Sequence, residues 1–204
     1  MTFTEKVLGS QPGDPELLAK HIAARAPEAE QRDEEVAAFS VGEEFEKGST
    51  VFARDEQGRF LWNYQIAGFF KENLGLLIEL GEVKTVSKWM CKRAVFGLVT
   101  VQPRRIRLLD PAGQPFLGEV SFLQRSARVD TMQGPRVCLV SSEELPPGSS
   151  AEFRVRLLTG GNPKSKMALT KRHLLDCFDY AAERGFGQWR SAGHGAFAWR
   201  EVPV

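Results

Sequence analysis

The sequence predicts a single α+β domain of 204 residues, and three observations lead to this class. Apolar residues make up 42% of the chain and charged residues 26%, a composition typical of a globular domain that buries its own core. Some stretches repeat apolar residues at helical spacing, and others alternate apolar and polar residues as half-buried strands do. No internal repeat or long linker divides the chain, so we expect one domain over residues 1–204.

The N-terminal part is predicted to hold a strand, a helix and an acidic segment. We expect a short strand over residues 2–8. A helix begins at Asp14-Pro15, where a typical N-cap residue precedes a proline at the first helical position. Pro27 ends this helix. Residues 28–48 are acidic and contain two glycines, which favours either an inserted helix or a loop that covers the domain.

A hairpin and a long helix follow the acidic segment. Residues 51–54 and 60–64 are predicted to be two strands around a turn that ends in Gly58. Apolar residues then recur at helical spacing from Ile66 to Leu80, and a glycine directly after them ends the helix.

Extended segments occupy the middle of the chain. Residues 98–101 and 106–109 are predicted strands interrupted by Pro103. Residues 136–140 form a third extended run. Residues 151–157 alternate apolar and polar side chains, which indicates a strand with one buried face.

A helix, a glycine-rich loop and a strand complete the chain. Thr170 caps the helix, and a strand near the C-terminus carries Phe197 and Trp199 on one face. The predicted buried face of the helix consists of Leu174, Leu175, Phe178, Ala181 and Ala182. The order of strand, helix, strands, helix and strand predicts a ferredoxin-like β-α-β-β-α-β core with insertions.

Charge is distributed unevenly along the chain, although the formal net charge is only +1. Residues 1–60 hold 13 acidic and 7 basic side chains, whereas residues 61–204 hold 13 acidic and 20 basic ones. Most of the latter are arginines, whose planar guanidinium groups suit phosphate binding and base stacking. The split predicts one acidic segment and one basic surface. The alternative is a set of solvated faces with local ion pairs.

Several classes of protein are disfavoured. The three cysteines, Cys91, Cys138 and Cys177, are odd in number and lack metal-site spacing, which argues against a disulfide framework and a zinc site and for a reducing compartment. The first residues do not resemble a secretory signal, and no run of about eighteen apolar residues occurs. We therefore expect a cytoplasmic protein with no membrane span, no metal and no cofactor.

The loop before the last strand is the most informative segment. Its glycines follow the pattern G-x-G, five residues, G-x-G, which matches neither a mononucleotide P-loop nor a dinucleotide-binding fingerprint. An amide, an indole and a guanidinium stand between the glycine pairs, a set that suits single-stranded nucleic acid. The alternative is a tight structural turn with its tryptophan in the core. The candidate binding residues are Gly185, Gly187, Gln188, Trp189, Arg190, Gly193, His194 and Gly195.

The pattern of Gly185-Phe186-Gly187, five residues and Gly193-His194-Gly195 resembles the glycine-rich loop of the RAMP superfamily (repeat-associated mysterious proteins). Its members are CRISPR effector-backbone subunits and guide-RNA-processing endoribonucleases. Residues 51–71 are similar to the Arg-Asp-x-x-Gly hairpin and following helix of the backbone subunits, and residues 142–153 resemble a further hairpin of theirs. The chain departs from the pattern at residues 63–67, where a Gly-Ser-Ser-x-Lys-Gly segment is expected, and only Lys71 can substitute for its lysine.

The resemblance implies a ferredoxin-like fold of RAMP type, related to the RNA recognition motif. It implies single-stranded RNA as the partner, with single-stranded DNA as the alternative, held by the loop and an arginine-rich groove. Arg104, Arg105 and Arg136 are further candidate contacts with the nucleic acid, because the central insertion of RAMP proteins commonly contacts RNA. Their neighbours Arg107, Arg125 and Arg128 are contacts that the resemblance implies in the same way. The candidate stacking residues are Trp62, Trp89 and Tyr64, although packing inside the domain is the expected role of each.

The resemblance also implies assembly partners and an origin. The protein is expected to associate with further copies of itself or with other RAMP-type subunits. It is expected in the cytoplasm of a bacterial cell or of a phage-infected host, encoded by a CRISPR system, a phage or another mobile element.

Three hypotheses for function follow. The sequence shows no clear catalytic constellation, so the first is a non-catalytic RNA-binding protein. The second is a metal-independent endoribonuclease with His194 or His21 as general acid or base. The third is a RAMP-fold protein that docks on CRISPR-type subunits as an inhibitor, mimic or assembly protein, which the acidic segment favours. Because a fold does not imply a function, the site must decide among them.

Overall fold

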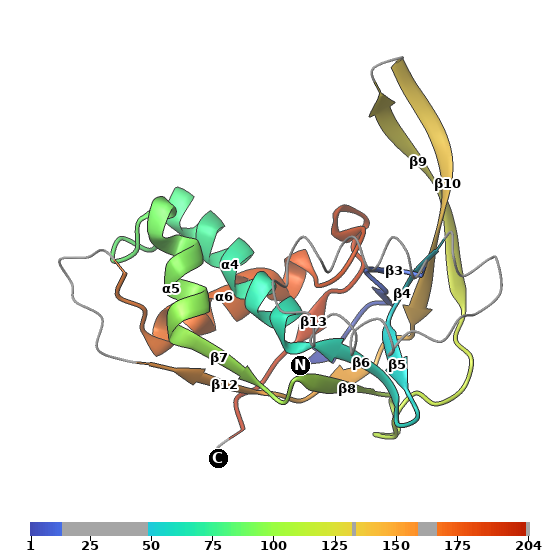
Figure 1. Cartoon of the computed structure of the whole chain (residues 1–204), viewed down its shortest axis with the longest axis horizontal. Coiled ribbons are helices and arrows are strands. Elements are labelled where there is room, and N and C mark those ends of the chain that lie inside the picture. The colour runs from blue at the N-terminus through green and yellow to red at the C-terminus, as the bar shows by residue number, and fades with distance from the viewer. Residues whose placement is uncertain (14–48, 132–133, 159–166, 203–204) are drawn as a thin grey trace, which may run out of the picture.

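The computed structural model describes residues 1–13, 49–131, 134–158 and 167–202, and of residues 127–131 and 134–138 it describes the backbone alone. It confirms the α+β class. Helices gather at one end of the body, strands lie beneath and beside them, and a two-stranded arm projects at the other end (Figure 1). The predicted helix at Asp14-Pro15, His21, the acidic residues 28–48 and the basic loop around residue 164 lie outside the described residues.

Six short strands form the principal sheet in the order β13-β1-β11-β8-β6-β5, with every neighbouring pair antiparallel. They are β1 (Thr2–Phe3), β5 (Ala53–Asp55), β6 (Gly58–Trp62), β8 (Arg105–Leu109), β11 (Ser150–Ala151) and β13 (Phe197–Ala198). β7 (Val99–Gln102) and β12 (Arg154–Leu157) pair with each other and lie next in sequence to β8 and β11.

A second sheet carries the arm. Its strands are β2 (Val7–Leu8), β10 (Gly134–Leu145), β4 (Ser49–Val51) and β3 (Gln11–Pro12), with β9 (Phe122–Thr131) also paired to β10. β9 and β10 pair from Gly134↔Thr131 down to Glu143↔Phe122 and rise from the body (Figure 1). The predicted strand over residues 2–8 is wrong as one element. The chain bends after β1, where the N–H groups of Thr4 and Glu5 both donate to the carbonyl of Ala196, and β2 joins the second sheet.

The two predicted helices in the described part of the chain are confirmed. α4 (Asn63–Glu79) ends at Leu80, followed by Gly81 at φ +81°. α6 (Lys171–Arg184) is capped by Thr170, whose hydroxyl accepts from the N–H of His173. Three short helices among the described residues were not expected, because so few residues produce little periodicity. They are η1 (Lys88–Met90), α5 (Cys91–Leu98) and η3 (Arg190–Ala192), the last within the glycine-rich loop.

The predicted extended segments are largely confirmed as well. The hairpin turns at residues 56–57, with Ala53 opposite Phe60, but Tyr64 belongs to α4 instead of the second strand. Pro103 separates β7 from β8 as expected. Residues 136–140 lie within β10, and residues 151–157 alternate in exposure across β11 and β12.

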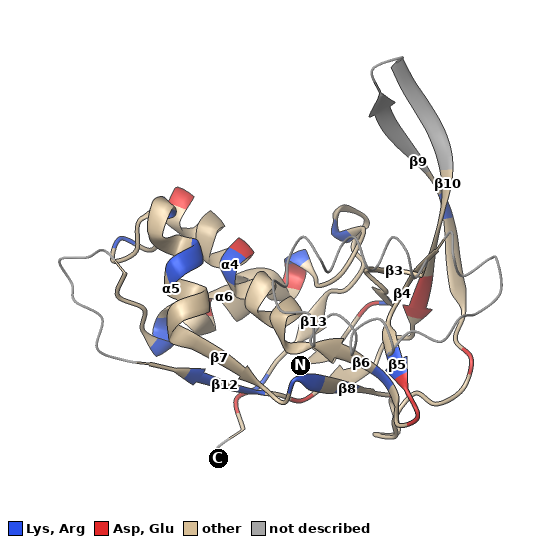
Figure 2. Cartoon of the chain, in the orientation of Figure 1, with Lys and Arg blue, Asp and Glu red and all other residues tan. Residues whose placement is uncertain are grey.

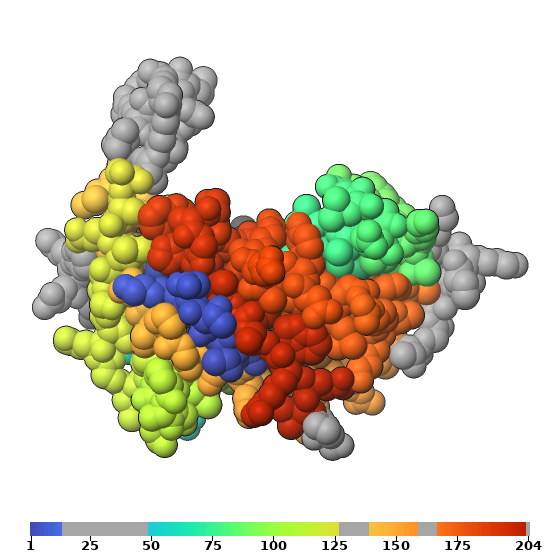
Figure 3. All heavy atoms as spheres, turned by 180° about the vertical axis from the view of Figure 1, so that it is seen from behind, coloured from blue at the N-terminus to red at the C-terminus, as the bar shows by residue number. Residues whose placement is uncertain are grey.

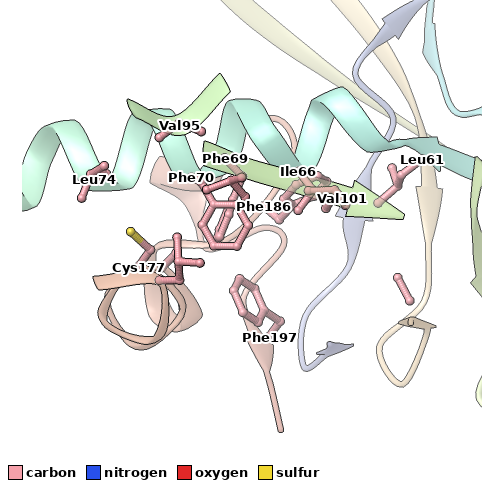
Figure 4. Packing of buried hydrophobic residues seen from close by; sticks show 14 of the residues in the cluster. Leu61, Ile66, Phe69, Phe70, Leu74, Val95, Val101, Cys177, Phe186 and Phe197 are labelled. Carbon is pink, nitrogen blue, oxygen red and sulfur yellow. The ribbon is translucent and has the colours of Figure 1, made fainter. Parts of the chain in front are cut away.

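The main core lies between the principal sheet and the helices α4 and α6. Phe69 and Phe70 of α4 pack on Phe178 of α6, with ring centroids 5.5 Å and 5.3 Å apart. Phe186, at the start of the glycine-rich loop, and Phe197, just after it, join the same cluster (Figure 4). The core therefore anchors both ends of the loop.

Candidate nucleic-acid interface

The glycine-rich loop, residues 185–195, connects α6 to β13 and is held by its own backbone. The N–H of Phe186 donates to the carbonyl of Gly195, and the N–H of Gly195 donates to the carbonyl of Lys6, each at 2.8 Å. A Cβ atom on Gly195 would lie 1.9 Å from the oxygen of Phe186, and one on Gly185 would lie 2.3 Å from the oxygen of His194. These two glycines, both at positive φ, are therefore required by the close approach of the loop's two sides.

The inner two glycines differ from each other. A Cβ atom on Gly187 would lie 2.8 Å from the oxygen of Leu8, so this glycine lets the loop pack against β2. Gly193 has φ +86° and nothing within 4 Å of such a Cβ atom. Only backbone conformation requires a glycine there.

Trp189 is the central side chain of the loop. It is a non-glycine residue with a left-handed backbone, at φ +53°, and its side chain is half-buried. The ring of His194 stacks on it at 5.0 Å with an interplanar angle of 19°. The guanidinium of Arg125, from β9 at the base of the arm, lies 4.6 Å from the indole centroid. Trp189 belongs to neither of the two hydrophobic clusters, so the alternative that buries it in the core is wrong.

Arg125, a contact implied by the resemblance, is the arginine that the fold brings onto Trp189. Its Nε atom is buried without a hydrogen-bond partner, and no carboxylate among the described residues pairs with its charge. From behind, the yellow base of the arm lies beside the orange-red glycine-rich loop (Figure 3). The sequence offers Arg125 as one of several arginines, and strand β9, which was not expected, is what brings it to Trp189.

Arg190 is engaged by a carboxylate of α4. Its Nη2 atom donates to Oε1 of Glu72 at 2.8 Å, and Arg184 donates to the same oxygen at the same distance. Burial alone raises the pKa of Glu72, but the hydrogen bonds and charges of Arg190 and Arg184 outweigh it and lower the pKa. The carboxylate of Glu72 therefore occupies the place beside the Arg190 guanidinium that a phosphate oxygen could otherwise take.

The loop also contacts the second sheet. Oε1 of Gln188 accepts from the hydroxyl of Thr50 at 3.5 Å, and that hydroxyl is 2.8 Å from the hydroxyl of Ser142 on β10. Gln188 thus faces β4 and β10 beside the arm. We call Arg125, Trp189, Arg190 and His194 the loop site.

A cleft of about 530 Å³ opens beside His194. It is lined by Glu5, Lys6, Glu183, Ala192, Gly193, His194 and Ala196. The Nζ atom of Lys6 donates to Glu144 at 2.9 Å. Burial raises the pKa of Glu144, but Lys6, Ser121 and His194 together lower it.

The predicted contacts Arg104 and Arg105 lie in a different environment. The guanidinium of Arg104 is 5.3 Å from the ring of Trp62, and that of Arg105 is 5.4 Å from the ring of Phe60. Asp55 accepts hydrogen bonds from Arg105 at 2.8 Å and from Arg107 at 2.7 Å. The bond from Arg107 is the main cause that lowers the pKa of Asp55 to about 2.

These residues form what we call the β6–β8 cluster: Asp55, Phe60, Trp62, Arg104, Arg105 and Arg107. Both of its aromatic rings are buried, with Trp62 only 1% exposed, so packing is their role, as expected of Trp62. The contacts of the glycine-rich loop run instead to β2, β4, β9 and α4. Arg136, the remaining predicted contact, lies on β10, and its side chain is outside the description.

Comparison of the chain with protein-family models finds no match, and comparison with curated proteins finds none either. Within the described ranges, no helix combines the length and the apolar character needed to cross a membrane. The function is therefore inferred from the chemistry of the loop site. The loop site offers an indole partly open to solvent, a guanidinium that no described carboxylate neutralises and an imidazole, which together suit a flat ring linked to a phosphate.

Proposed function

We propose that the protein binds single-stranded nucleic acid, RNA in the first place, at the loop site. The observation that carries this proposal is the half-buried Trp189 with the guanidinium of Arg125, which pairs with no described carboxylate, at 4.6 Å from its ring. A base stacks on the indole once the guanidinium moves from the ring to the adjacent phosphate. Stacking on aromatic rings and pairing of arginine with phosphate are the usual means of holding a single strand.

Arg190 supplies a second phosphate contact in this proposal. A phosphate oxygen competes with the carboxylate of Glu72 for its guanidinium, and Arg184 remains to neutralise Glu72. Binding should weaken as salt rises, because phosphate contacts release counterions.

We further propose that the domain has the ferredoxin-like fold of RAMP proteins. Taken in chain order, β1, α4, β8, β11, α6 and β13 follow the order β-α-β-β-α-β. Their strands lie in the order β13-β1-β11-β8, all antiparallel, which is the 4-1-3-2 order of a ferredoxin-like sheet. The second sheet and the arm are then insertions, and the glycine-rich loop precedes the last strand, as the resemblance implies. This topology supports the proposal.

The test is binding of a fluorescent single-stranded RNA of about 20 nucleotides, followed by anisotropy at low and moderate salt. The variants are Trp189→Ala and Arg125→Gln. A matched control is Arg172→Gln, which removes one exposed arginine from α6. We expect salt-sensitive binding by the wild type and the control. Affinity should be about fivefold to 150-fold lower in Trp189→Ala, from about 1–3 kcal/mol per stacked base.

Circular dichroism and thermal melting establish that each variant is folded. A folded Trp189→Ala variant with wild-type affinity would overturn the loop site. A folded wild type that binds neither RNA nor single-stranded DNA would overturn the function and leave docking on RAMP-type subunits as the next hypothesis. Stronger binding of single-stranded DNA than of RNA would correct the choice of nucleic acid.

A second candidate function is cleavage of the bound RNA. The cleft beside the loop brings His194 together with Lys6 and two carboxylates, the group types that act as general acid and base on a 2′-hydroxyl and a phosphate. Each binding reaction is therefore run on a denaturing gel. Intact RNA supports the non-catalytic protein, whereas cleavage that His194→Asn abolishes would favour the endoribonuclease.

A further inference from the structure

A second cationic and aromatic surface lies at the other end of the molecule. Trp89 of η1 is 90% exposed, so the packing role expected of it is wrong. Phe96 of α5 is 50% exposed. Isolated surface aromatics are common, but two of them beside several lysines and arginines indicate an interaction site. We call Lys88, Trp89, Lys92, Arg93 and Phe96 the α5 surface.

Helical spacing places these side chains together. Trp89, Lys92, Arg93 and Phe96 are at positions i, i+3, i+4 and i+7, so they share one face. The opposite face of α5 carries Cys91, Ala94 and Val95, all buried in the main core. Because these three residues are packed in the core, the other face of α5 points to solvent. Figure 2 shows basic residues of α5 in blue.

The charge of the α5 surface is positive. From Lys84 to Leu98 every charged residue is a lysine or an arginine. Lys88 pairs with Glu79 at the end of α4, at 2.6 Å. Lys92 and Arg93 are exposed and have no carboxylate partner among the described residues. The fitting partner is thus an anion that also presents flat rings.

Single-stranded nucleic acid fits this description better than a lipid bilayer does. An interfacial helix inserts a broad apolar face into the membrane, but the apolar face of α5 is buried in the core. Trp89 and Phe96 alone remain outside, interleaved with cations. That arrangement is typical of surfaces on which bases stack while phosphates meet basic side chains.

The α5 surface is also continuous with the loop site along α4. Glu72 contacts Arg190 of the loop site, and Glu79, seven residues further on the same helix, contacts Lys88. Two turns of helix cover about 10 Å, a distance that a single strand spans within a few nucleotides. Figure 1 shows α4 running from β6 toward the end of the molecule that carries α5, away from the arm.

We propose that the α5 surface is a second contact site for the strand bound at the loop site, with Trp89 stacking a base and Lys92 and Arg93 pairing with phosphates. This inference rests on the proposed function for its class of ligand, but on different residues. It implies that short and long oligonucleotides depend differently on the two surfaces.

The test compares an RNA of two nucleotides, which is too short to span the roughly 10 Å between the two surfaces, with a single-stranded RNA of about 20 nucleotides by fluorescence anisotropy. The variant is Trp89→Ala/Arg93→Ala. The matched control is Tyr180→Ala/Arg172→Gln, which removes an exposed aromatic ring and an arginine from α6. We expect the variant to bind the long RNA about tenfold more weakly than the wild type, and the short RNA, which reaches the loop site alone, equally well. The control should bind both as the wild type does.

Each other outcome has a definite meaning. If Trp89→Ala/Arg93→Ala binds the long RNA like the wild type while Trp189→Ala does not, the α5 surface is overturned and the proposed function stands. If the wild type binds neither RNA, both are overturned. Sedimentation of the wild type, but not of the α5 variant, with vesicles of phosphatidylserine and phosphatidylcholine would overturn the nucleic-acid assignment in favour of a membrane surface.

Discussion

The β6–β8 cluster and the loop site combine the same residue types in opposite ways. In the β6–β8 cluster, Trp62 is 1% exposed and two arginines lie over it, at 5.3 Å and 5.6 Å from its ring. In the loop site, Trp189 is half-buried and one arginine lies over it, at 4.6 Å. Contact between a cation and an aromatic ring is therefore common to both regions and identifies neither as a binding site.

Exposure and charge compensation distinguish the two. Asp55 forms ion pairs with both Arg105 and Arg107 in the β6–β8 cluster, whereas Arg125 has no carboxylate partner among the described residues. Side chains that are buried and paired with one another stabilise the fold, whereas a cation without a carboxylate partner beside a partly exposed ring can still pair with a ligand. We infer that the first region is structural and the second is the binding site.

Replacing each tryptophan by alanine tests this division most strongly. Trp62→Ala removes a fully packed indole and should lower the free energy of unfolding by about 3–5 kcal/mol. Trp189→Ala should lower it by about 1 kcal/mol or less, because the ring is partly solvated and lies outside both hydrophobic clusters. Urea unfolding followed by circular dichroism measures both. Equal losses of stability would show that Trp189 is a core residue as well.

A pair of glycine substitutions sharpens the description of the loop. Gly195→Ala combines a positive φ with a contact of 1.9 Å to the oxygen of Phe186, and it should cost about 2–4 kcal/mol of folding free energy. Gly193→Ala, with a similar φ and open space around it, should cost about 1 kcal/mol. Thermal denaturation of the two variants gives the comparison. Similar melting temperatures would mean that the loop opens to accept the added methyl group.

Acid sensitivity tests the β6–β8 cluster by itself. The pKa of Asp55 is about 2 in the folded protein, below its usual value of 3.8, so the ionised carboxylate stabilises the fold above that usual value. This contribution is lost as the pH falls from about 4 to about 2. Urea midpoints measured across this range should fall less steeply for Asp55→Asn than for the wild type. Parallel curves would exclude a stabilising role for the pairing with Arg105 and Arg107.

The smallest expected effect concerns Glu72 and the loop site. Glu72→Gln removes the charge that competes with phosphate for Arg190, so RNA affinity should rise by up to about fivefold, in line with the 0–1 kcal/mol of a partly exposed ion pair. Anisotropy titration at low salt resolves this change, with Glu201→Gln as the control, because Glu201 pairs with Lys171 outside both the loop site and the α5 surface. A loss of affinity would indicate that Glu72 positions Arg190 for the ligand instead of competing with it.

Local sequence patterns were sufficient for the α+β class and for most described elements. Helix α4 follows from apolar residues at every third or fourth position, and the hairpin ending in Gly58 from a turn between two apolar runs. The spacing of the glycines likewise predicted a loop between α6 and β13 and singled out Trp189 and Arg190 within it. Each of these signals involves residues a few positions apart, and their backbone geometry depends mainly on their own side chains.

The tertiary structure alone decided which predicted residues are available to a ligand. Arg59 and Glu143 form a buried ion pair, at 2.6 Å, that ties β6 to the base of the arm across 84 positions of sequence. In the same way Asp55 pairs with Arg105, Glu72 pairs with Arg190, and Arg125 comes to lie on Trp189. Exposure and charge compensation depend on neighbours that only the folded chain brings together, so no local pattern could separate the arginines that stabilise the fold from those proposed to bind a strand.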